Sequence, residues 1–406
     1  MKSSARWLTV IGIGEDGLDG LSAVAREALT SADVLVGGDR HLAMVPDDGC
    51  ERIIWGSPLA ATLDRIMEMA GRPVAVLATG NPMWFGIGAT LSRSVPPEEM
   101  RIIPAPSAFS LAASRLGWRM AEVECLTLHG RSIDRVRYFL SPGTRMIILS
   151  HDGETPAQIA SILRETGFGK SAITVLTNMS GPEEDMLANT ADEWGSSPVA
   201  DFNTIAIHCQ SRPESRIISR VPGLPDDVFR HDGTITKREV RAATLASLAP
   251  LPGQLLWDVG AGHGTIAIEW MRSDVKGTAR AVAIEQNADR INAIRDNALA
   301  LGVPDLDIVA GKAPGVLAEL KPPDAVFIGG GLSTTDMLAT CWNNLKPGGR
   351  LVANSVTFEG EKILMEWTET TKGDLIRFGI SYGSAVGSFK SWDPAKPVTQ
   401  LRATKK

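Results

Sequence analysis

The chain has 406 residues, of which 44% are hydrophobic and 22% charged, as in globular proteins large enough for two or three domains. No apolar run approaches the roughly 18 residues that a membrane helix needs. A formal net charge of −6 and the lack of a Lys/Arg tract argue against a broad nucleic-acid surface. We therefore expect neither a nucleic-acid partner nor a membrane.

The cysteines and the start of the chain predict a cytoplasmic protein. Cys50, Cys125, Cys209 and Cys341 are far apart and include no C-x-x-C pair, which favours reduced thiols. The first six residues run straight into a strand-like segment without a signal-peptide pattern. No cluster of metal-ligand residues is present in the sequence, so we expect no metal bound by the protein itself.

The first 210 residues alternate between strand-like runs and helical patterns. Helical patterns such as Leu59–Met69 and Ala157–Thr166 repeat apolar residues at intervals of three and four. This rhythm predicts a largely parallel sheet covered by helices. The strand-like runs are Trp7–Ile13, Val34–Gly37, Val74–Ala78, Arg145–Leu149, Ile173–Leu176 and Thr204–His208.

Two glycine-rich turns follow strands in this half. Val10–Gly17 contains a G-x-G-x-x-G pattern, which is a weak signal alone, and no acid ends the second strand as a dinucleotide site would require. The third strand runs into Thr79–Gly88, a turn rich in glycine and proline that opens a helix. Two such turns in one sheet predict a trough for a large ligand.

A segment rich in proline and charge, including Ser211–Glu214 and Val221–Asp227, separates the halves. We expect domains at 1–212 and 225–406, joined by a linker at 213–224. The second half opens with a helix at Lys237–Leu248 and fits a doubly wound sheet. Its expected strands are Leu255–Val259, Arg280–Glu285, Asp307–Val309, Ala325–Ile328, Leu351–Asn354 and Leu375–Ser381, with Val398–Leu401 as an antiparallel edge.

Asp258–Gly264 is the most informative motif, because it places an acid and three alternating glycines between a strand and a helix. Glycine lets the backbone approach a ligand closely. Asp258 would repel a pyrophosphate and attract the ammonium and sulfonium of S-adenosylmethionine (SAM). Glu285, at the tip of the next strand, is placed for ribose hydroxyls. SAM is the favoured ligand; NAD and a tight turn without a ligand are the alternatives.

The chain resembles two families of cobalamin-biosynthetic methylases in sequence. Gly12–Gly17, Thr79–Gly88, Pro104–Ser110 and Leu128–Ser132 resemble the tetrapyrrole methylases, and among them the E-type precorrin methylases. Residues 225–406 resemble their T-type companions in Thr236–Arg241, Asp258–Gly264 and Gly329–Gly331. The resemblance covers nearly the whole chain. It implies an α/β protein with an N-terminal tetrapyrrole-methylase fold of two α/β subdomains, followed by a Rossmann-like SAM-dependent methyltransferase domain.

The resemblance implies one SAM per domain and a precorrin-6-type tetrapyrrole as substrate. Methylation at carbons 5 and 15, loss of the ring-C acetate as carbon dioxide and a homo-oligomeric state are expected. The candidates for binding substrate carboxylates are Lys237, Arg241, His129 and Arg131. Lys237 and Arg241 share one helix face. His129 and Arg131 belong to the family motif Leu128–Ser132. The cofactor candidates are Asp258, Gly260, Gly262, Gly264, Glu285, Thr236 (also the expected N-cap of its helix), Gly311 and Ala313 in the second half, and Gly12, Gly80, Asn81, Pro82, Ser107 and Ala108 in the first.

Two positions depart from the family pattern. Glu15 stands where a proline is usual, and Asn81 stands where an acid is usual, which removes a charge near a cationic cofactor. Three other readings stay open: the same chemistry on a cobalt-containing ring, an RNA or protein methyltransferase, and a non-catalytic binding module. The acidic balance and the absence of an Asn-Pro-Pro-aromatic turn at Gly329–Gly331 count against the RNA or protein methyltransferase.

Overall fold

The computed structural model describes residues 6–47 and 49–406, so the start of the chain, on which the expectation of no signal peptide rests, lies outside the described residues. The chain forms two compact units. Along the sequence, the boundary between them falls between Arg216 and Ile217, within the predicted linker at 213–224. The segment Asp134–Leu140 groups with the second unit rather than with its sequence neighbours. The Tyr138 hydroxyl donates to the Asp274 carbonyl at 2.6 Å there, an arrangement that the predicted boundaries did not anticipate.

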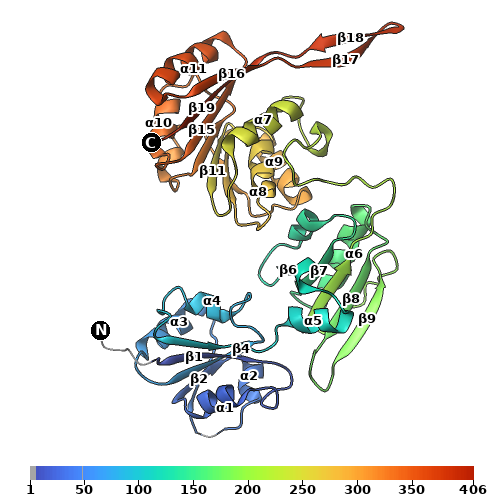
Figure 1. Cartoon of the computed structure of the whole chain (residues 1–406), viewed down its shortest axis with the longest axis vertical. Coiled ribbons are helices and arrows are strands. Elements are labelled where there is room, and N and C mark those ends of the chain that lie inside the picture. The colour runs from blue at the N-terminus through green and yellow to red at the C-terminus, as the bar shows by residue number, and fades with distance from the viewer. Residues whose placement is uncertain (1–5, 48) are drawn as a thin grey trace. The chain divides into compact units, whose positions relative to one another are not determined.

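A five-stranded parallel sheet in the order β3-β2-β4-β1-β5 begins the first unit. Alternate residues of its strands fill two separate cores: Val10 and Val76 pack on one face, Ile11 and Leu77 on the other. Helices cover both faces (Figure 1), which is why the central strands β1, β2 and β4 are mostly apolar, whereas charged residues occur in the edge strands β3 and β5. The elements are β1 (Leu8–Ile13), α1 (Ala23–Thr30), β2 (Val34–Gly37), α2 (Asp39–Ala43), β3 (Glu51–Ile54), α3 (Leu59–Glu68), β4 (Val74–Thr79), α4 (Ile87–Leu91) and β5 (Met100–Ile103).

A second sheet completes the first unit, in the order β6-β7-β10-β8-β9. Here the expectation of one largely parallel sheet is wrong: β10 runs antiparallel to β7 and β8, and β8 runs antiparallel to β9. Apolar runs report burial but not strand direction, and β9 has no apolar run because five of its six residues are exposed. The elements are α5 (Ala108–Leu116), β6 (Val123–Thr127), β7 (Arg145–Leu149), α6 (Thr155–Glu165), β8 (Ala172–Thr177), β9 (Asp185–Thr190) and β10 (Asn203–His208), with a short 3₁₀ turn at Met120–Glu122. The 3₁₀ segment Ile133–Phe139 lies almost entirely in the part of the chain that groups with the second unit.

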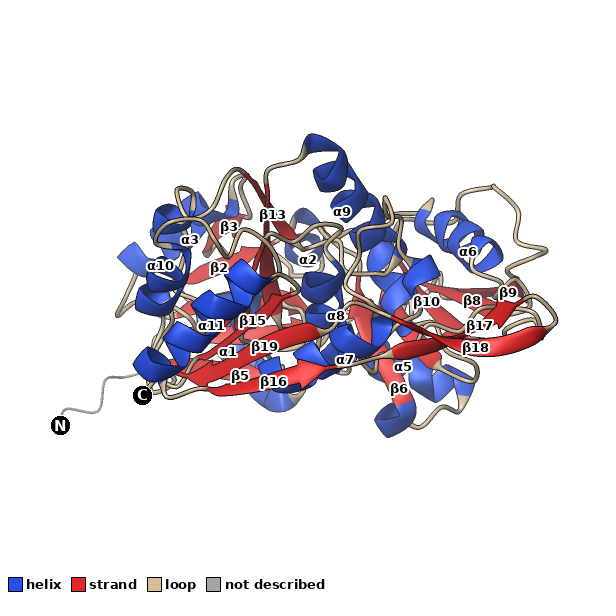
Figure 2. Ribbon diagram, turned by 90° about the horizontal axis from the view of Figure 1, so that it is seen from above, coloured by secondary structure: helices blue, strands red, loops and turns tan. Residues whose placement is uncertain are grey.

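The second unit is built on a seven-stranded sheet in the order β13-β12-β11-β14-β15-β19-β16, and it confirms the expected Rossmann-like half. Helices α10 and α11 bury one face against Trp257, Val326 and Leu351, and Figure 2 shows α11 beside β15 and β19. The elements are α7 (Arg238–Leu248), β11 (Leu255–Val259), α8 (Thr265–Ser273), β12 (Arg280–Glu285), α9 (Ala288–Ala300), β13 (Asp307–Ala310), β14 (Ala325–Ile328), α10 (Met337–Asn344), β15 (Arg350–Ser355), α11 (Phe358–Thr371), β16 (Asp374–Phe378) and β19 (Val398–Thr404), with 3₁₀ turns at Asp226–Val228 and Leu317–Glu319.

The C-terminal strands differ from expectation in two ways. The last strand, β19, is antiparallel as predicted, but it lies between β15 and β16 and is not an edge. Leu401 and Gln400 on it are fully buried, which an edge strand would not require. The segment between β16 and β19 forms a hairpin of β17 (Ser381–Val386) and β18 (Phe389–Pro394) that projects from the second unit (Figure 1).

None of the helices among the described residues combines the length and the apolar character needed to cross a bilayer.

Candidate functional site

A cavity of about 800 Å³ opens in the second unit where the parallel strands end. Its walls come from the turns after β11, β12, β13, β14 and β15, because parallel strands deliver their carboxyl ends to the same edge of the sheet. Most of the predicted residues of this half meet there. The predicted residues that line the cavity are Thr236, Lys237, Gly260, Gly262, Glu285, Gly311 and Ala313, together with the segment Gly329–Gly331.

The glycine turn after β11 needs left-handed backbone at three positions, with φ of +69° at Gly260, +59° at Gly262 and +76° at Gly264. A Cβ on Gly260 would lie 2.9 Å from the backbone of Gly330, so the two turns touch. Gly262 faces open space, since a Cβ there would meet no described atom within 4 Å. Gly264 does not line the cavity: its Cβ would press on Ile294, so it serves the packing of α8 on α9.

Glu285 ties the end of β12 to this turn. One carboxylate oxygen accepts the Gly262 N–H at 2.9 Å, and the other accepts the N–H groups of Gln286 and Asn287. The side chain is 7% exposed and lines the cavity. An anchored carboxylate at this edge can accept hydrogen bonds from hydroxyl groups without having to be ordered first.

Asp258 lies beneath the turn and is not part of the cavity lining, contrary to the expectation that it points into the loop. It is 1% exposed, and its Oδ2 accepts the Ala267 N–H at 3.0 Å in the first turn of α8. Its Oδ1 has no hydrogen-bond partner among the described residues. Burial, reinforced by the charge of Glu285, raises the pKa of Asp258 to about 7.

Helix α7 brings Thr236 and Lys237 to the cavity but turns Arg241 away from it. The N-cap is Lys237, one residue later than expected, and no side chain among the described residues caps the helix. Arg241 is fully buried and bonds Glu269 at 2.5 Å, Asp226 at 3.1 Å and the carbonyls of Thr236 and Leu224. The prediction that Arg241 holds a substrate carboxylate is therefore wrong, because its donors are already used inside the protein.

The first unit contains a second cavity, of about 750 Å³, between the ends of its two sheets. Five of the residues predicted as site residues in this half line the cavity: Gly80, Asn81, Ser107, Ala108 and His129. Gly12 and Pro82 do not. A Cβ on Gly12 would lie 1.9 Å from the Gly80 carbonyl oxygen, so Gly12 is needed for the close approach of two turns, and Pro82 is buried under Gly86 and Gly88.

The two departures from the family pattern have local partners. Glu15 lines the cavity and pairs with Arg40, which also lies 4.0 Å from the centre of the Phe202 ring. Asn81 uses its side-chain oxygen to accept the Met83 N–H at 3.0 Å, closing the turn on itself.

Aromatic and histidine side chains make up much of the remaining wall. Trp84 packs on Phe109 with ring centres 5.1 Å apart. His129 lies 5.7 Å from His151, ring centre to ring centre, and both line the cavity. Arg131 stands 5.5 Å from the centre of the Phe85 ring and does not line the cavity itself. Burial lowers the pKa of His41, another wall residue, to about 4, with the charge of Arg40 as a further cause.

Several wall residues were missed from the sequence. Lys312, Lys396, Arg290, Asn354 and Tyr382 line the second-unit cavity. Lys312 lies between Gly311 and Ala313, which were predicted to contact the cofactor, so its segment was identified although Lys312 itself was not chosen as a site residue. Tyr382 and Lys396 gave no signal in the sequence, because Tyr382 lies on β17 and Lys396 lies between β18 and β19, and their place at the cavity depends on how these strands fold back on the sheet. No three His, Cys, Asp or Glu side chains within 6–47 and 49–406 come together as a metal site.

Comparison with known proteins gives the same division of the chain. Residues 7–194 match the tetrapyrrole (corrin/porphyrin) methylases, and residues 227–405 match the precorrin methyltransferase domain family. A precorrin-6Y C(5,15)-methyltransferase [decarboxylating] of Sinorhizobium sp is 44% identical over 98% of this chain and 96% of its own. The protein of that name from Mycobacterium tuberculosis (strain CDC 1551 / Oshkosh) is 38% identical over 98% of this chain and 100% of its own.

A solved structure, the C-terminal domain of precorrin-6Y C5,15-methyltransferase from Rhodobacter capsulatus, is 41% identical over 46% of this chain and all of that one, with a TM-score of 0.44. The two full-length relatives, each above 30% identity and matched from end to end, establish the family. The chain belongs to the decarboxylating precorrin-6Y C(5,15)-methyltransferases.

Proposed function

We propose that this protein methylates a precorrin-6-type tetrapyrrole at carbons 5 and 15 and releases one ring acetate as carbon dioxide, in the cytoplasm, with one SAM bound in each unit. The observation that carries the proposal is the presence of two cavities, each at glycine-rich strand ends, in units that match two methyltransferase families. A single-site RNA or protein methyltransferase would leave the cavity of the first unit without a role.

The second-unit cavity fits a nucleoside with a charged amino-acid tail. Glu285 would accept the ribose hydroxyls, Gly311 and Ala313 would flank the adenine, and the open floor at Gly262 would admit the tail. SAM supplies an activated methyl group when bound there. The chain's own residues orient the acceptor carbon and exclude water, which suffices when that carbon is already nucleophilic, as an enamine-like bridge carbon is.

Substrate carboxylates need cations, and the exposed lysines at the cavity are better placed than Arg241. Lys312 and Lys396 line the cavity and form no ion pair within the part of the chain that the structure describes. Lys237 also lines it and lies 3.4 Å from Asp226. We propose that these lysines hold the peripheral carboxylates while the conjugated ring accepts the electrons of the departing acetate. Whether the ring carries cobalt does not alter this role.

The glutamate at the end of β12 tests the assignment of the second site. Glu285→Ala should weaken SAM binding in that site by about tenfold to hundredfold, since it removes a charged acceptor. The site of the first unit should be untouched and is the internal control. Calorimetric titration of the full chain should therefore show one of two binding events weakened by that factor and the other unchanged, and mass spectrometry of the tetrapyrrole product should show reduced loss of carbon dioxide at a limiting SAM concentration. Two unchanged binding events would refute the assignment.

The pKa of Asp258 predicts a pH dependence. Because the pKa is raised to about 7 in the folded protein, the folded state binds this proton more tightly than the unfolded state, and the free energy of unfolding falls as the pH rises from about 4 to about 7. The positively charged sulfonium of a SAM molecule bound nearby would favour the ionised form of Asp258. SAM affinity in the second site should therefore rise roughly threefold to tenfold between about pH 6 and about pH 8, beyond any rise seen for S-adenosylhomocysteine, which lacks the sulfonium charge. Asp258→Asn should abolish that difference; equal pH profiles for both ligands in the unaltered protein would contradict the idea.

The lysines give a separate test of substrate binding. Lys312→Met and Lys396→Met should each raise the KM for the tetrapyrrole by about threefold to tenfold and leave SAM affinity unchanged, because each removes one charge-assisted contact while keeping the side-chain length. Lys362→Met, on the exposed face of α11 beside Glu366, is the matched control. Steady-state kinetics on metal-free and cobalt-containing rings would also show which ring is preferred. If a variant carrying both Lys312→Met and Lys396→Met kept an unchanged KM for the tetrapyrrole, these lysines would not bind the substrate carboxylates.

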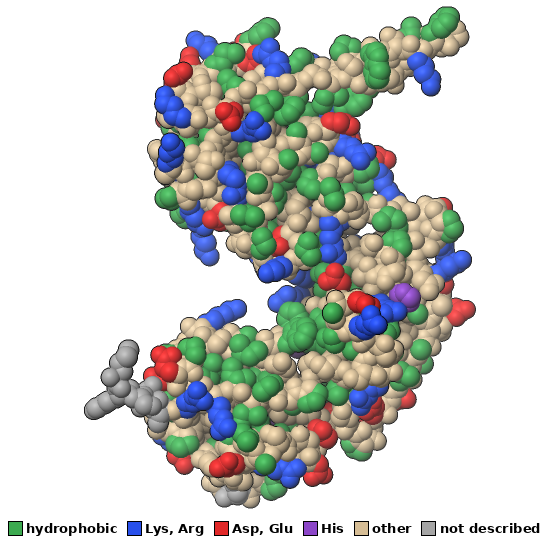
Figure 3. All heavy atoms as spheres, in the orientation of Figure 1, with side chains coloured by type: hydrophobic (Ala, Val, Ile, Leu, Met, Phe, Trp, Pro, Cys, Tyr) green, Lys and Arg blue, Asp and Glu red, His purple; other side chains and the backbone are tan. Residues whose placement is uncertain are grey.

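The projecting hairpin supports a homo-oligomer. Its two strands pair only with each other, and an isolated two-stranded hairpin is marginally stable in water. Phe389 and Trp392 on it are 78% and 74% exposed, and Figure 3 shows hydrophobic side chains along this arm. We propose that a second copy of the chain covers it, since two identical open strand edges can pair with one another.

Light scattering tests this contact. The protein should have a multiple of its chain mass of 43.3 kDa, and Phe389→Ser combined with Trp392→Ser should reduce it to one chain. Phe358→Ser, at an equally exposed position at the start of α11, should leave the assembly intact. A monomeric mass for the unaltered protein would overturn the proposal.

A further inference from the structure

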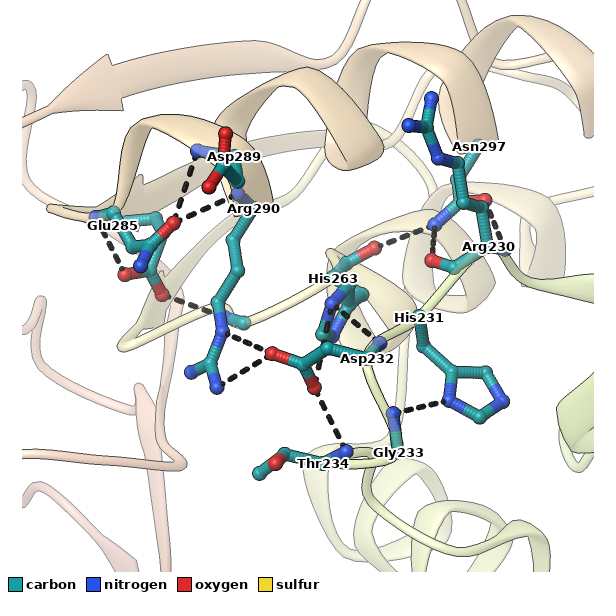
Figure 4. A network of polar contacts seen from close by, with 12 residues as sticks. Arg230, His231, Asp232, Gly233, Thr234, His263, Glu285, Asp289, Arg290 and Asn297 are labelled. Atoms are coloured by element: carbon teal, nitrogen blue, oxygen red, sulfur yellow. Dashed lines mark hydrogen bonds and ion pairs between the residues drawn. The ribbon is translucent and has the colours of Figure 1, made fainter.

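His263 occupies the fourth position of the glycine turn and is held there by two neighbouring elements. Its backbone carbonyl accepts the side-chain N–H of Asn297 on α9 at 3.0 Å. Its ring Nε2 accepts the backbone N–H of Asp232 at 3.2 Å, from the segment that leads into α7. Asp232 is in turn fixed by Arg290, whose two donors lie 2.9 and 3.0 Å from one carboxylate oxygen (Figure 4).

This arrangement determines where the ring carries its proton. Since Nε2 acts as an acceptor, the neutral imidazole must have its hydrogen on Nδ1. Burial lowers the pKa of His263 and favours the neutral form, and it outweighs the charge of Asp232 and the Thr234 backbone, which act to raise that pKa. The carboxylate of Asp232 lies 3.7 Å from Nε2, on the side of the ring opposite to the donor. His263 therefore has one N–H group to offer, and its direction is set by the fold.

That donor is buried without an acceptor. The side chain is 4% exposed and lines the cavity, and Nδ1 has no hydrogen-bond partner among the described residues. Buried donors are nearly always paired in folded proteins, and an unpaired one is destabilising. An acceptor that arrives with a ligand would remove this penalty, and the turn on which His263 lies is the one expected to meet the charged tail of the cofactor.

We propose that His263 donates its Nδ1–H to a carboxylate of a ligand bound in the second-unit cavity. The inference rests on the proposed function, since both expected ligands carry carboxylates: SAM on its amino-acid tail, and the tetrapyrrole on its acetate and propionate arms. His263 is thus a binding residue that fixes the orientation of a carboxylate relative to the glycine turn. The network of Asp232, Arg290 and Asn297 positions it.

The test compares two variants of the full chain. His263→Phe keeps the ring shape and removes the donor, whereas His263→Gln keeps an N–H donor. Both are titrated with S-adenosylhomocysteine and with 5′-methylthioadenosine, which lacks the amino-acid carboxylate. If the cofactor tail is the acceptor, His263→Phe should bind S-adenosylhomocysteine about tenfold more weakly and 5′-methylthioadenosine normally, and His263→Gln should restore part of the loss.

If the tetrapyrrole is the acceptor, both nucleosides should bind normally and the KM for the tetrapyrrole should rise about tenfold in His263→Phe and less in His263→Gln. Normal nucleoside binding together with an unchanged KM would overturn the proposal. Amide hydrogen exchange in α8 and α9 checks that the variants are folded. Nitrogen-15 spectra of histidine-labelled protein give an independent readout, because a proton found on Nε2 in the unliganded chain would also overturn it. Failure of the unaltered protein to bind SAM in this unit would instead refute the proposed function.

Discussion

The second unit depends on a pair of buried carboxylates that hold a left-handed glycine turn in place. Glu285 accepts the Gly262 N–H from the cavity side, and Asp258 accepts the Ala267 N–H from below. Their proximity has a cost, seen in the pKa of Asp258, which burial and the charge of Glu285 raise to about 7. Because the pKa of Asp258 lies near neutral pH, a positive charge bound nearby would shift the balance between its protonated and ionised forms. The groups that shape the turn are thus also those that would respond to a cationic cofactor.

Charges in this unit are divided between structure and ligand. Arg241 and Glu269 are both buried and join α7 to α8, and Glu269 also accepts the N–H groups of Gly223 and Leu224 at the end of the predicted linker. A buried arginine whose three guanidinium nitrogens all bond to neighbouring residues cannot serve a ligand. Lys312 and Lys396, which line the cavity and form no ion pair among the described residues, lie instead on exposed segments.

The first unit reaches a cavity of similar size by other means. Its walls include Trp84 and Phe109, and its turn is closed by the neutral amide of Asn81 instead of an acid. Glu15 brings back a negative charge to the lining, but Arg40 neutralises it. Aromatic walls suit a reaction in which a sulfonium charge disappears, and the carboxylate of Asp201 also lines this cavity. The two cavities therefore differ in electrostatics while sharing glycine-rich strand ends.

The sequence by itself determined the first parallel sheet, the parallel core of the second unit, the glycine turn and the position of Glu285. These follow from local patterns: apolar runs of strand length, alternating glycines, and an acid at a strand tip. It did not determine the second sheet of the first unit, whose strands are largely antiparallel. It could not reveal that Arg241 is consumed in the interior, since a helix face says nothing about which neighbour covers it. Nor could it show that β19 is inserted between two strands, or that Lys396 and Tyr382 reach the cavity, because these depend on pairings between residues far apart in the chain. Only the tertiary structure decided which ring nitrogen of His263 carries the proton, since Nε2 accepts the backbone N–H of Asp232, a residue 31 positions earlier.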